Sequence, residues 1–109
     1  FTVRCIHRMD ILEKEVEKYL VQYAHKYNIL TYKLVSPGQS GVPDRILILK
    51  DGSVHFVELK APGKKPRPLQ QSVFAKLNNY HHPVSVIDSK EKARNYINFL
   101  RGRMIGYEV

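Results

Sequence analysis

The sequence is poor in cysteine, contains no tryptophan and has no long apolar run. Its single cysteine, Cys5, cannot form an intrachain disulfide, which excludes a disulfide-framed secreted module and a cysteine-built zinc site. No stretch reaches the roughly 18 consecutive apolar residues that span a bilayer. These absences favour a soluble, intracellular protein without a membrane partner.

Acidic residues are also scarce, with 10 Asp and Glu against 18 Lys and Arg, so the net charge is +8. This excess of positive charge favours polyanionic partners, and DNA is the natural candidate. A chain of 109 residues with 43% hydrophobic content can build one core. We interpret residues 1–8, which lack periodicity, as an extension or disordered start without a role, and 9–109 as a single domain.

Hydrophobic spacing and turn residues predict the elements along the chain. A three-and-four spacing predicts a first helix over 10–27 with Asp10 as its N-cap, and the pair Asp88 and Glu91 predicts a capping box for the last helix, which ends near Gly102. Between these helices we expect strands at 29–35, 44–49, 54–59 and 84–87, loops at 36–41 and 61–68, and a helix at 69–80. The order α-β-β-β-α-β-α predicts an α/β sheet with helices on its faces.

Two carboxylates and a lysine meet at the hairpin formed by 44–49 and 54–59. Glu58 and Lys60 alternate to the same face of their strand, and Asp44 heads the partner strand. A two-residue turn at Asp51-Gly52 would pair Asp44 with Leu59 and direct it to the other face, so we expect a bulged loop or splayed strand ends. The alternative is a surface ion pair between Glu58 and Lys60, with Asp44 as a turn residue.

A divalent metal would relieve the repulsion between these acids, because Mg²⁺ and Mn²⁺ prefer hard oxygen ligands. Asp44, Glu58 and the carbonyl of Leu59 are the predicted ligands, with water and phosphate oxygens completing the shell. Lys60 would orient or deprotonate a water, or neutralise charge in the transition state. This chemistry is phosphodiester hydrolysis.

Three segments, Gly41-Val42-Pro43-Asp44-Arg45, Val57-Glu58-Leu59-Lys60-Ala61-Pro62-Gly63 and Pro68-Leu69-Gln70, occur in the order found in one nuclease family. Over roughly residues 10–100 the chain resembles the VRR-NUC branch of the PD-(D/E)xK superfamily. The resemblance implies a restriction-endonuclease-like core with a mixed sheet, in which Asp44 and Glu58 bind the metal and Lys60 is the catalytic lysine.

The resemblance also implies roles for two further residues. Gln70 would hold the site or contact a phosphate, although it can equally satisfy backbone groups at the start of its helix. Glu13 matches the first-helix glutamate best, as a metal or water-mediated ligand, and Glu15 and Glu17 are the alternatives. Family members of this single-domain size resemble phage or bacterial enzymes that form homodimers and cut branched DNA such as four-way junctions. The resemblance therefore implies a homodimer and branched DNA for this chain.

Basic residues near the site are predicted to grip the DNA backbone. These are Arg45, Lys64, Lys65 and Arg67, and the alternative for the loop residues is a solvated, mobile segment. The five histidines lack the spacing of a zinc site, so we interpret them as structural or surface residues. The sequence thus predicts a Mg²⁺- or Mn²⁺-dependent endodeoxyribonuclease. A non-catalytic or partner-dependent nucleic-acid-binding module and an RNA-directed nuclease remain alternatives.

Overall fold

The computed structural model describes the backbone of residues 2–104 and the side chains of residues 12–104. Seven elements follow one another: α1 (Thr2–Lys26), β1 (Leu30–Lys33), β2 (Arg45–Ile48), β3 (Val54–Leu59), α2 (Pro68–Asn79), β4 (Val84–Ile87) and α3 (Lys90–Arg103). The predicted order α-β-β-β-α-β-α is therefore confirmed. The strand β1 is shorter than the predicted span 29–35, whereas β3 and β4 have the expected bounds.

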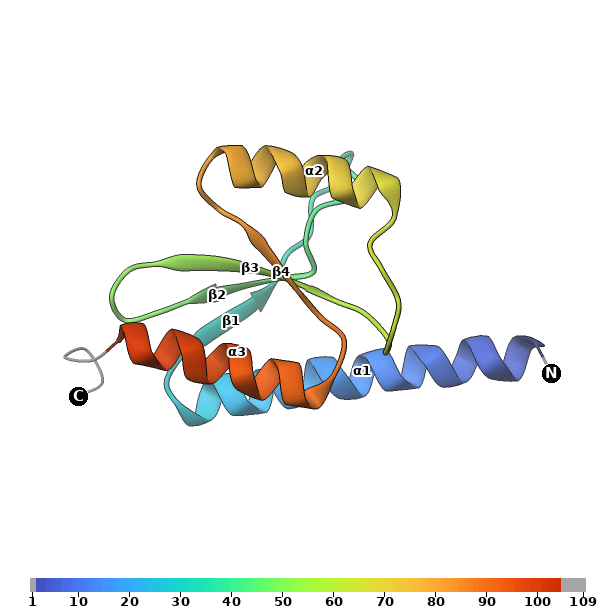
Figure 1. Cartoon of the computed structure of the whole chain (residues 1–109), viewed down its shortest axis with the longest axis horizontal. Coiled ribbons are helices and arrows are strands. Elements are labelled where there is room, and N and C mark those ends of the chain that lie inside the picture. Colours follow the sequence, from blue (N-terminus) through green and yellow to red (C-terminus); the bar gives the residue numbers. More distant parts are fainter. Residues whose placement is uncertain (1, 105–109) are drawn as a thin grey trace.

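The four strands form one mixed sheet in the order β1-β2-β3-β4. β1 and β2 pair antiparallel, as do β2 and β3, while β3 and β4 pair parallel. A parallel pair needs a crossover, and α2 supplies it. In Figure 1, α2 lies over one face of the sheet, and α1 and α3 lie together over the other. This is the mixed sheet flanked by helices that the sequence predicts.

The apolar core lies between the sheet and the pair α1 and α3. Strand residues at alternate positions supply its sheet side, since successive side chains point to opposite faces. The buried members include Leu47 of β2 with Leu49 just after that strand, Val57 and Leu59 of β3, Leu20 of α1 and Ile97 of α3. The intervening positions of β2 and β3 face α2 instead. Glu58 is one of these, so the candidate site belongs to the α2 face.

The β2–β3 turn sets the register of the hairpin. Gly52 N donates to Leu49 O and Leu49 N donates to Ser53 O, both at 3.0 Å, which closes a loop of the three residues 50–52. Gly52 has φ +88°, the left-handed conformation that such a loop requires. Arg45 consequently pairs with Val57. The extra loop residue that the sequence required is thus present, and it turns Asp44 to the same face as Glu58.

The starts of two helices differ from the sequence prediction. α1 begins at Thr2, so the expected start at Asp10 is wrong, and no proline or glycine interrupts residues 2–9. α3 has Ser89 as its N-cap, with the Oγ atom accepting from Lys92 N at 3.1 Å. The predicted capping role of Asp88 is wrong, because its carboxylate has other partners.

Phe1 and residues 105–109 lie outside the described residues, as do the side chains of residues 2–11. The interpretation of residues 1–8 as an extension therefore stays a prediction. Among the helices that the structure describes, none is both long and apolar enough to cross a membrane.

Candidate active site

Asp44 and Glu58 meet where the β2–β3 pair ends. Asp44 directly precedes β2, and its Oδ2 atom accepts a hydrogen bond from the backbone N of Leu59 at 2.8 Å. Its backbone O accepts from Leu34 N, also at 2.8 Å. These bonds tie Asp44 to both neighbouring strands, so its position follows from the sheet register and not from a flexible loop.

Gly41 holds the segment before Asp44 against the start of α2. Its φ is +89°, and a Cβ atom placed on it would lie 3.1 Å from both the backbone O of Leu69 and the Cγ2 atom of Val73. Only glycine accepts this backbone conformation and this close approach without strain. The segment that carries Asp44 and the helix that carries Gln70 are therefore packed directly on each other.

The carboxylate of Glu58 is buried, with 1% of the residue exposed. Its Oε2 atom accepts from Gln70 Nε2 at 2.6 Å and lies 3.0 Å from Lys60 Nζ. Its Oε1 atom is buried and has no hydrogen-bond partner. Because an unsatisfied buried oxygen of a charged group is costly, this atom is a natural position for a cation.

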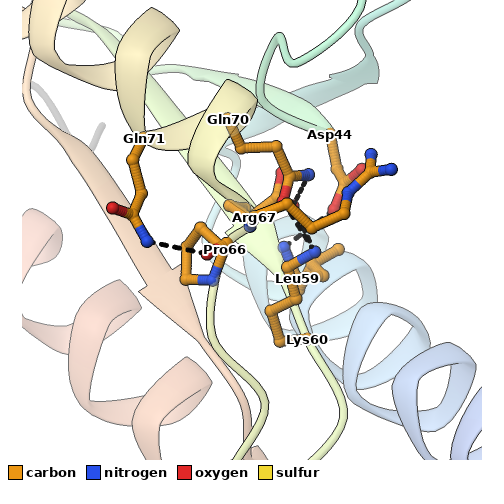
Figure 2. Close-up of polar contacts among 8 residues, drawn as sticks. Asp44, Leu59, Lys60, Pro66, Arg67, Gln70 and Gln71 are labelled. Atoms are coloured by element: carbon orange, nitrogen blue, oxygen red, sulfur yellow. Dashed lines mark hydrogen bonds and ion pairs between the residues drawn. The ribbon is translucent and has the colours of Figure 1, made fainter.

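Gln70 connects the members of the site, as Figure 2 shows. Its Nε2 atom donates to Glu58, and its Oε1 atom accepts from Lys60 Nζ at 3.1 Å and from the backbone N of Arg67 at 2.8 Å. The last of these bonds satisfies a free backbone donor at the N-terminus of α2. One amide therefore performs both of the tasks that the sequence left as alternatives, since it caps α2 and orients Glu58 and Lys60.

Electrostatic interactions at Glu58 oppose one another. Burial raises the pKa of its carboxyl group above the ordinary value, and the negative charge of Asp44 raises that pKa further. The hydrogen bond and positive charge of Lys60 act in the opposite direction without cancelling the effect of burial. Two ionised carboxylates are therefore unfavourable in this site, and a further positive charge beside them would stabilise their ionised forms.

The donor set fits a hard divalent cation. Asp44 and Glu58 offer carboxylate oxygens, and one Glu58 oxygen has no protein partner. Among the residues that the structure describes, no three His, Cys, Asp or Glu side chains come together as a metal-binding group. An ion here would thus depend on the two acids, with backbone carbonyl, water or phosphate oxygens as further ligands. The predicted carbonyl ligand, Leu59, directly follows Glu58 in the sequence, and its backbone N donates to Asp44.

The first-helix acids lie on α1, on the other side of the sheet from α2. Glu17 forms an ion pair with Arg45, with Oε2 to Nη1 at 3.1 Å, and Arg45 Nε also donates to Thr31 Oγ1 at 3.2 Å. Arg45 is thus occupied within the protein, and any contact with phosphate would compete with these bonds. Glu13 is half-buried one turn before Glu17, and its role as a metal ligand stays a prediction.

The basic loop between β3 and α2 is exposed but anchored. Lys64, Lys65 and Arg67 are all exposed. Gly63 N donates to Asp88 Oδ2 at 3.1 Å, and Gln71 Nε2 donates to Pro66 O at 2.9 Å, a contact visible in Figure 2. The loop therefore presents its charges next to Lys60 from fixed attachment points.

Replacing Asp88 by asparagine tests the attachment of this loop. Hydrogen bonds from Lys92 and from the Gly63 amide lower the pKa of the Asp88 carboxyl below its ordinary value. A lowered folded-state pKa stabilises the fold above the unfolded pKa, and that stability is lost as the pH falls through the folded value. Asp88→Asn should therefore lower the free energy of unfolding by about 1 kcal/mol at pH 7.

Urea denaturation of both proteins at pH 7 and near pH 3 measures this difference. The gap between wild type and Asp88→Asn should narrow at the lower pH, because wild-type Asp88 is then becoming protonated. A gap of constant size would show that the charge of Asp88 does not act on the loop. Lys92 Nζ lies 2.9 Å from Asp88 Oδ1 but is well exposed, so it contributes little by itself.

Sequence reasoning missed the hydrogen bond by which Asp88 holds the basic loop at Gly63, because the sequence pattern assigned Asp88 to the cap of the last helix. It also missed the packing of Gly41 on α2, for which the only sequence signal is a glycine two residues before the Pro43-Asp44 pair. The contact of Gln70 with Glu58 joins residues 12 positions apart, and no local pattern encodes it. All three are tertiary contacts.

Known proteins resemble this chain in sequence and in fold. It is 47% identical over 81 residues to a protein named "Putative nuclease p44" of Acyrthosiphon pisum secondary endosymbiont phage 1, covering 74% of this chain and 87% of that protein. A solved structure described as a VRR_NUC domain superposes with a TM-score of 0.70 and 28% sequence identity, covering 89% of this chain and 97% of the other. No family model matches the chain.

Proposed function

We propose that this chain, which belongs to the VRR-NUC family of nucleases, is an endonuclease that hydrolyses DNA with the help of Mg²⁺ or Mn²⁺. The observation that carries the proposal is the buried Glu58 carboxylate beside Asp44, with one oxygen that lacks a protein partner. A binding module would have no use for two acids facing a polyanion. An intracellular site of action, where such DNA is found, is part of the proposal.

Asp44, Glu58 and the Leu59 carbonyl would hold the metal ion, with Glu13 as a further candidate. When bound, the ion polarises the phosphate and lowers the pKa of a water molecule. Lys60 stands next to these ligands, restrained by Glu58 and by Gln70. Its ammonium group can orient the water or neutralise charge on the attacked phosphate, and in the neutral amine form Lys60 would accept a proton from the water.

Gln70 acts on the reaction by positioning. Its amide holds Glu58 and Lys60 at once, and α2 holds the amide because the same oxygen accepts from the Arg67 backbone. Lys64, Lys65 and Arg67 would bind the phosphates that flank the cut, which positions the strand without reading its sequence. The net charge of +8 supports the attraction of the whole molecule to DNA.

The substrate that we propose is branched DNA, with a four-way junction as the leading case, and the active form that we propose is a homodimer. Two sites related by a dyad would cut two strands symmetrically, which suits a junction with the same symmetry. Both points follow from the resemblance of the chain to stand-alone family members.

Cleavage assays on labelled DNA test the proposal. The substrates are a four-way junction, a flap, a linear duplex and a single strand, with an RNA strand in parallel, each with Mg²⁺, Mn²⁺ or EDTA. We expect cutting that requires metal, prefers the junction and produces paired symmetric nicks. Lys60→Ala should lower the cleavage rate by about 10²-fold or more, because it removes positive charge next to the reacting phosphate.

Lys76→Ala is the matched control, since Lys76 is an exposed lysine near the other end of α2, and it should cleave at nearly the wild-type rate. Asp44→Ala should be inactive with either metal. Binding without cutting under every metal condition would replace the proposal with the non-catalytic binding module. Cutting of RNA in preference to DNA would replace the substrate.

A further inference from the structure

A cavity lies away from the candidate active site. It has a volume of about 700 Å³ and is bounded by the β2–β3 turn, the turn between α2 and β4, and the C-terminal half of α3. Figure 1 shows the hairpin turn and the C-terminal end of α3 at the same end of the molecule. The lining includes none of the active-site residues. On β3, His55 precedes Glu58 by three residues, roughly 10 Å along the strand, and points to the opposite face.

The basic side chains that line this cavity are one arginine and three histidines; burial and the charge of Arg103 lower the pKa of His55, which favours its neutral imidazole. Arg103 and the imidazoles of His55, His81 and His82 contribute to the wall, and no carboxylate belongs to the described lining. Nearby Asp51 lies outside this lining; its carboxylate accepts hydrogen bonds from the backbone N and the Oγ atom of Ser53, and its charge interacts with Arg103 at a distance longer than an ion pair. Among the described residues, no ion pair involves Arg103. The cavity therefore suits an anionic ligand.

The cavity also offers an exposed aromatic surface. Phe99 of α3 lines it and is 64% exposed, while Tyr96 lies one helical turn earlier on the same wall. The ring of His82, another residue of the wall, meets Phe56 edge-on, with centroids 5.6 Å apart. Exposed aromatic rings beside cationic groups are the elements with which proteins bind unpaired nucleotides, since the bases stack and the phosphates pair with the cations. The volume lies within the range of about 300–1,000 Å³ of ligand pockets.

One wall residue has a strained backbone. His81 has φ +66°, the left-handed conformation, where it ends α2 with two bonds, His81 N to Asn78 O at 3.0 Å and His82 N to Leu77 O at 2.9 Å. Glycine is the usual residue at this position of a helix end. A histidine there costs some stability relative to glycine, and residues held in such conformations cluster at ligand-binding sites.

We propose that this cavity binds one unpaired nucleotide of a nucleic-acid strand, with Arg103 and the histidines contacting its phosphate and Phe99 stacking on its base. The inference goes beyond the proposed function, because it gives the nuclease a strand contact remote from the cut. It rests on nucleic acid as the substrate but not on catalysis. Loss of the cavity should weaken strand binding and raise KM while leaving kcat nearly unchanged.

Fluorescence anisotropy of a labelled single-stranded oligothymidylate, measured in EDTA, tests the contact without any cleavage. Arg103→Gln should weaken binding about tenfold, because it removes a charge-assisted contact with phosphate. Arg94→Gln is the matched control, since Arg94 is an exposed arginine of the same helix outside the cavity. It should weaken binding by about twofold or less, through net charge alone. Equal weakening in both variants would overturn the proposal.

Two further variants separate the base from the phosphate. Phe99→Ser should weaken binding of the oligothymidylate about tenfold but leave binding of an abasic strand unchanged. Because Phe99 is largely exposed, the fold should tolerate this change. His81→Gly should raise the thermal unfolding midpoint by about 5 °C and weaken strand binding. A more stable His81→Gly protein with unchanged affinity would count against the proposal.

Chemical-shift mapping by NMR locates the contact and identifies its source. Thymidine monophosphate should shift the backbone amides of 53–55, 81–82, 84–85 and 96–103, and should compete with the oligonucleotide better than inorganic phosphate does. Shifts confined to the surroundings of Glu58 would overturn the proposal. Binding of the mononucleotide without binding of the strand would also overturn it, in favour of a free nucleotide as the ligand. Neither result would bear on metal-dependent cleavage, so the two proposals fail separately.

Discussion

Replacing Glu58 by glutamine should reduce metal-dependent cleavage by about 10³-fold or more, since a metal ion supplies several kcal/mol of charge stabilisation in the transition state. The amide keeps the shape of the carboxylate but is a poor ligand for Mg²⁺ or Mn²⁺. Single-turnover rates on the preferred DNA substrate measure this effect. Glu91→Gln is the matched control, because Glu91 is exposed in the first turn of α3 and should leave the rate unchanged.

The same substitution should not destabilise the protein when metal is absent. Burial and the charge of Asp44 both raise the pKa of the Glu58 carboxyl, so its ionised form is disfavoured in the fold. A neutral amide removes that cost, and Gln70 can still hydrogen-bond to it. We expect a free energy of unfolding in EDTA within about 1 kcal/mol of the wild-type value, or above it.

The cleavage rate and the unfolding free energy of Glu58→Gln together distinguish a metal-binding role of Glu58 from a structural role. Loss of cleavage with retained stability assigns Glu58 to the reaction. Cleavage within tenfold of the wild-type rate would remove Glu58 from the metal site. Loss of both activity and stability would make Glu58 a structural residue, whose hydrogen bond with Gln70 holds the sheet to α2.

Replacing Gly41 by alanine should lower the free energy of unfolding by about 2–4 kcal/mol. The positive φ disfavours any Cβ atom, and this one would also meet the backbone O of Leu69 and the side chain of Val73. The backbone oxygen belongs to the first turn of α2 and cannot move without displacing that helix. Chemical denaturation monitored by circular dichroism measures the loss.

Gly38 provides the matched control for this prediction. It has φ +78° in the same loop, but a Cβ atom there would meet nothing within 4 Å. Gly38→Ala should therefore lower the free energy of unfolding by only about 1–2 kcal/mol, the cost of the backbone conformation alone. The difference between the two variants isolates the close approach to α2. Equal losses would show that the loop is not held by that contact.

The cleavage rate, like the stability, should fall more in Gly41→Ala than in Gly38→Ala. Gly41→Ala moves the segment that carries Asp44 relative to the helix that carries Gln70, and displacements of about 1 Å at a reacting centre can cost roughly 10²-fold in rate. Gly38→Ala should leave the cleavage rate within about twofold, because a Cβ atom at Gly38 contacts nothing and does not move Asp44 relative to α2. The rates are compared at a temperature where both variants are folded.

Several features of the fold followed from local patterns. The order of the elements and the bounds of β3 and β4 were predictable, because hydrophobic periodicity and turn residues act over a few residues. The start of α1 was not, since a helix without a proline or glycine to stop it continues beyond its amphipathic part. The cap of α3 was assigned to Asp88 although Ser89 holds that position, because both residue types cap helices and only the backbone path chooses between them.

The sequence by itself determined the chemical groups of this protein: two acids and a lysine in a nuclease pattern, a basic loop after them and an excess of positive charge. Tertiary structure decided how those groups meet. The third residue of the hairpin loop turns Asp44 to the face of Glu58, and the crossover of α2 brings the Gln70 amide to both Glu58 and Lys60. The physical reason is that residue types specify which bonds are possible, whereas strand register and helix packing determine which atoms come within bonding distance.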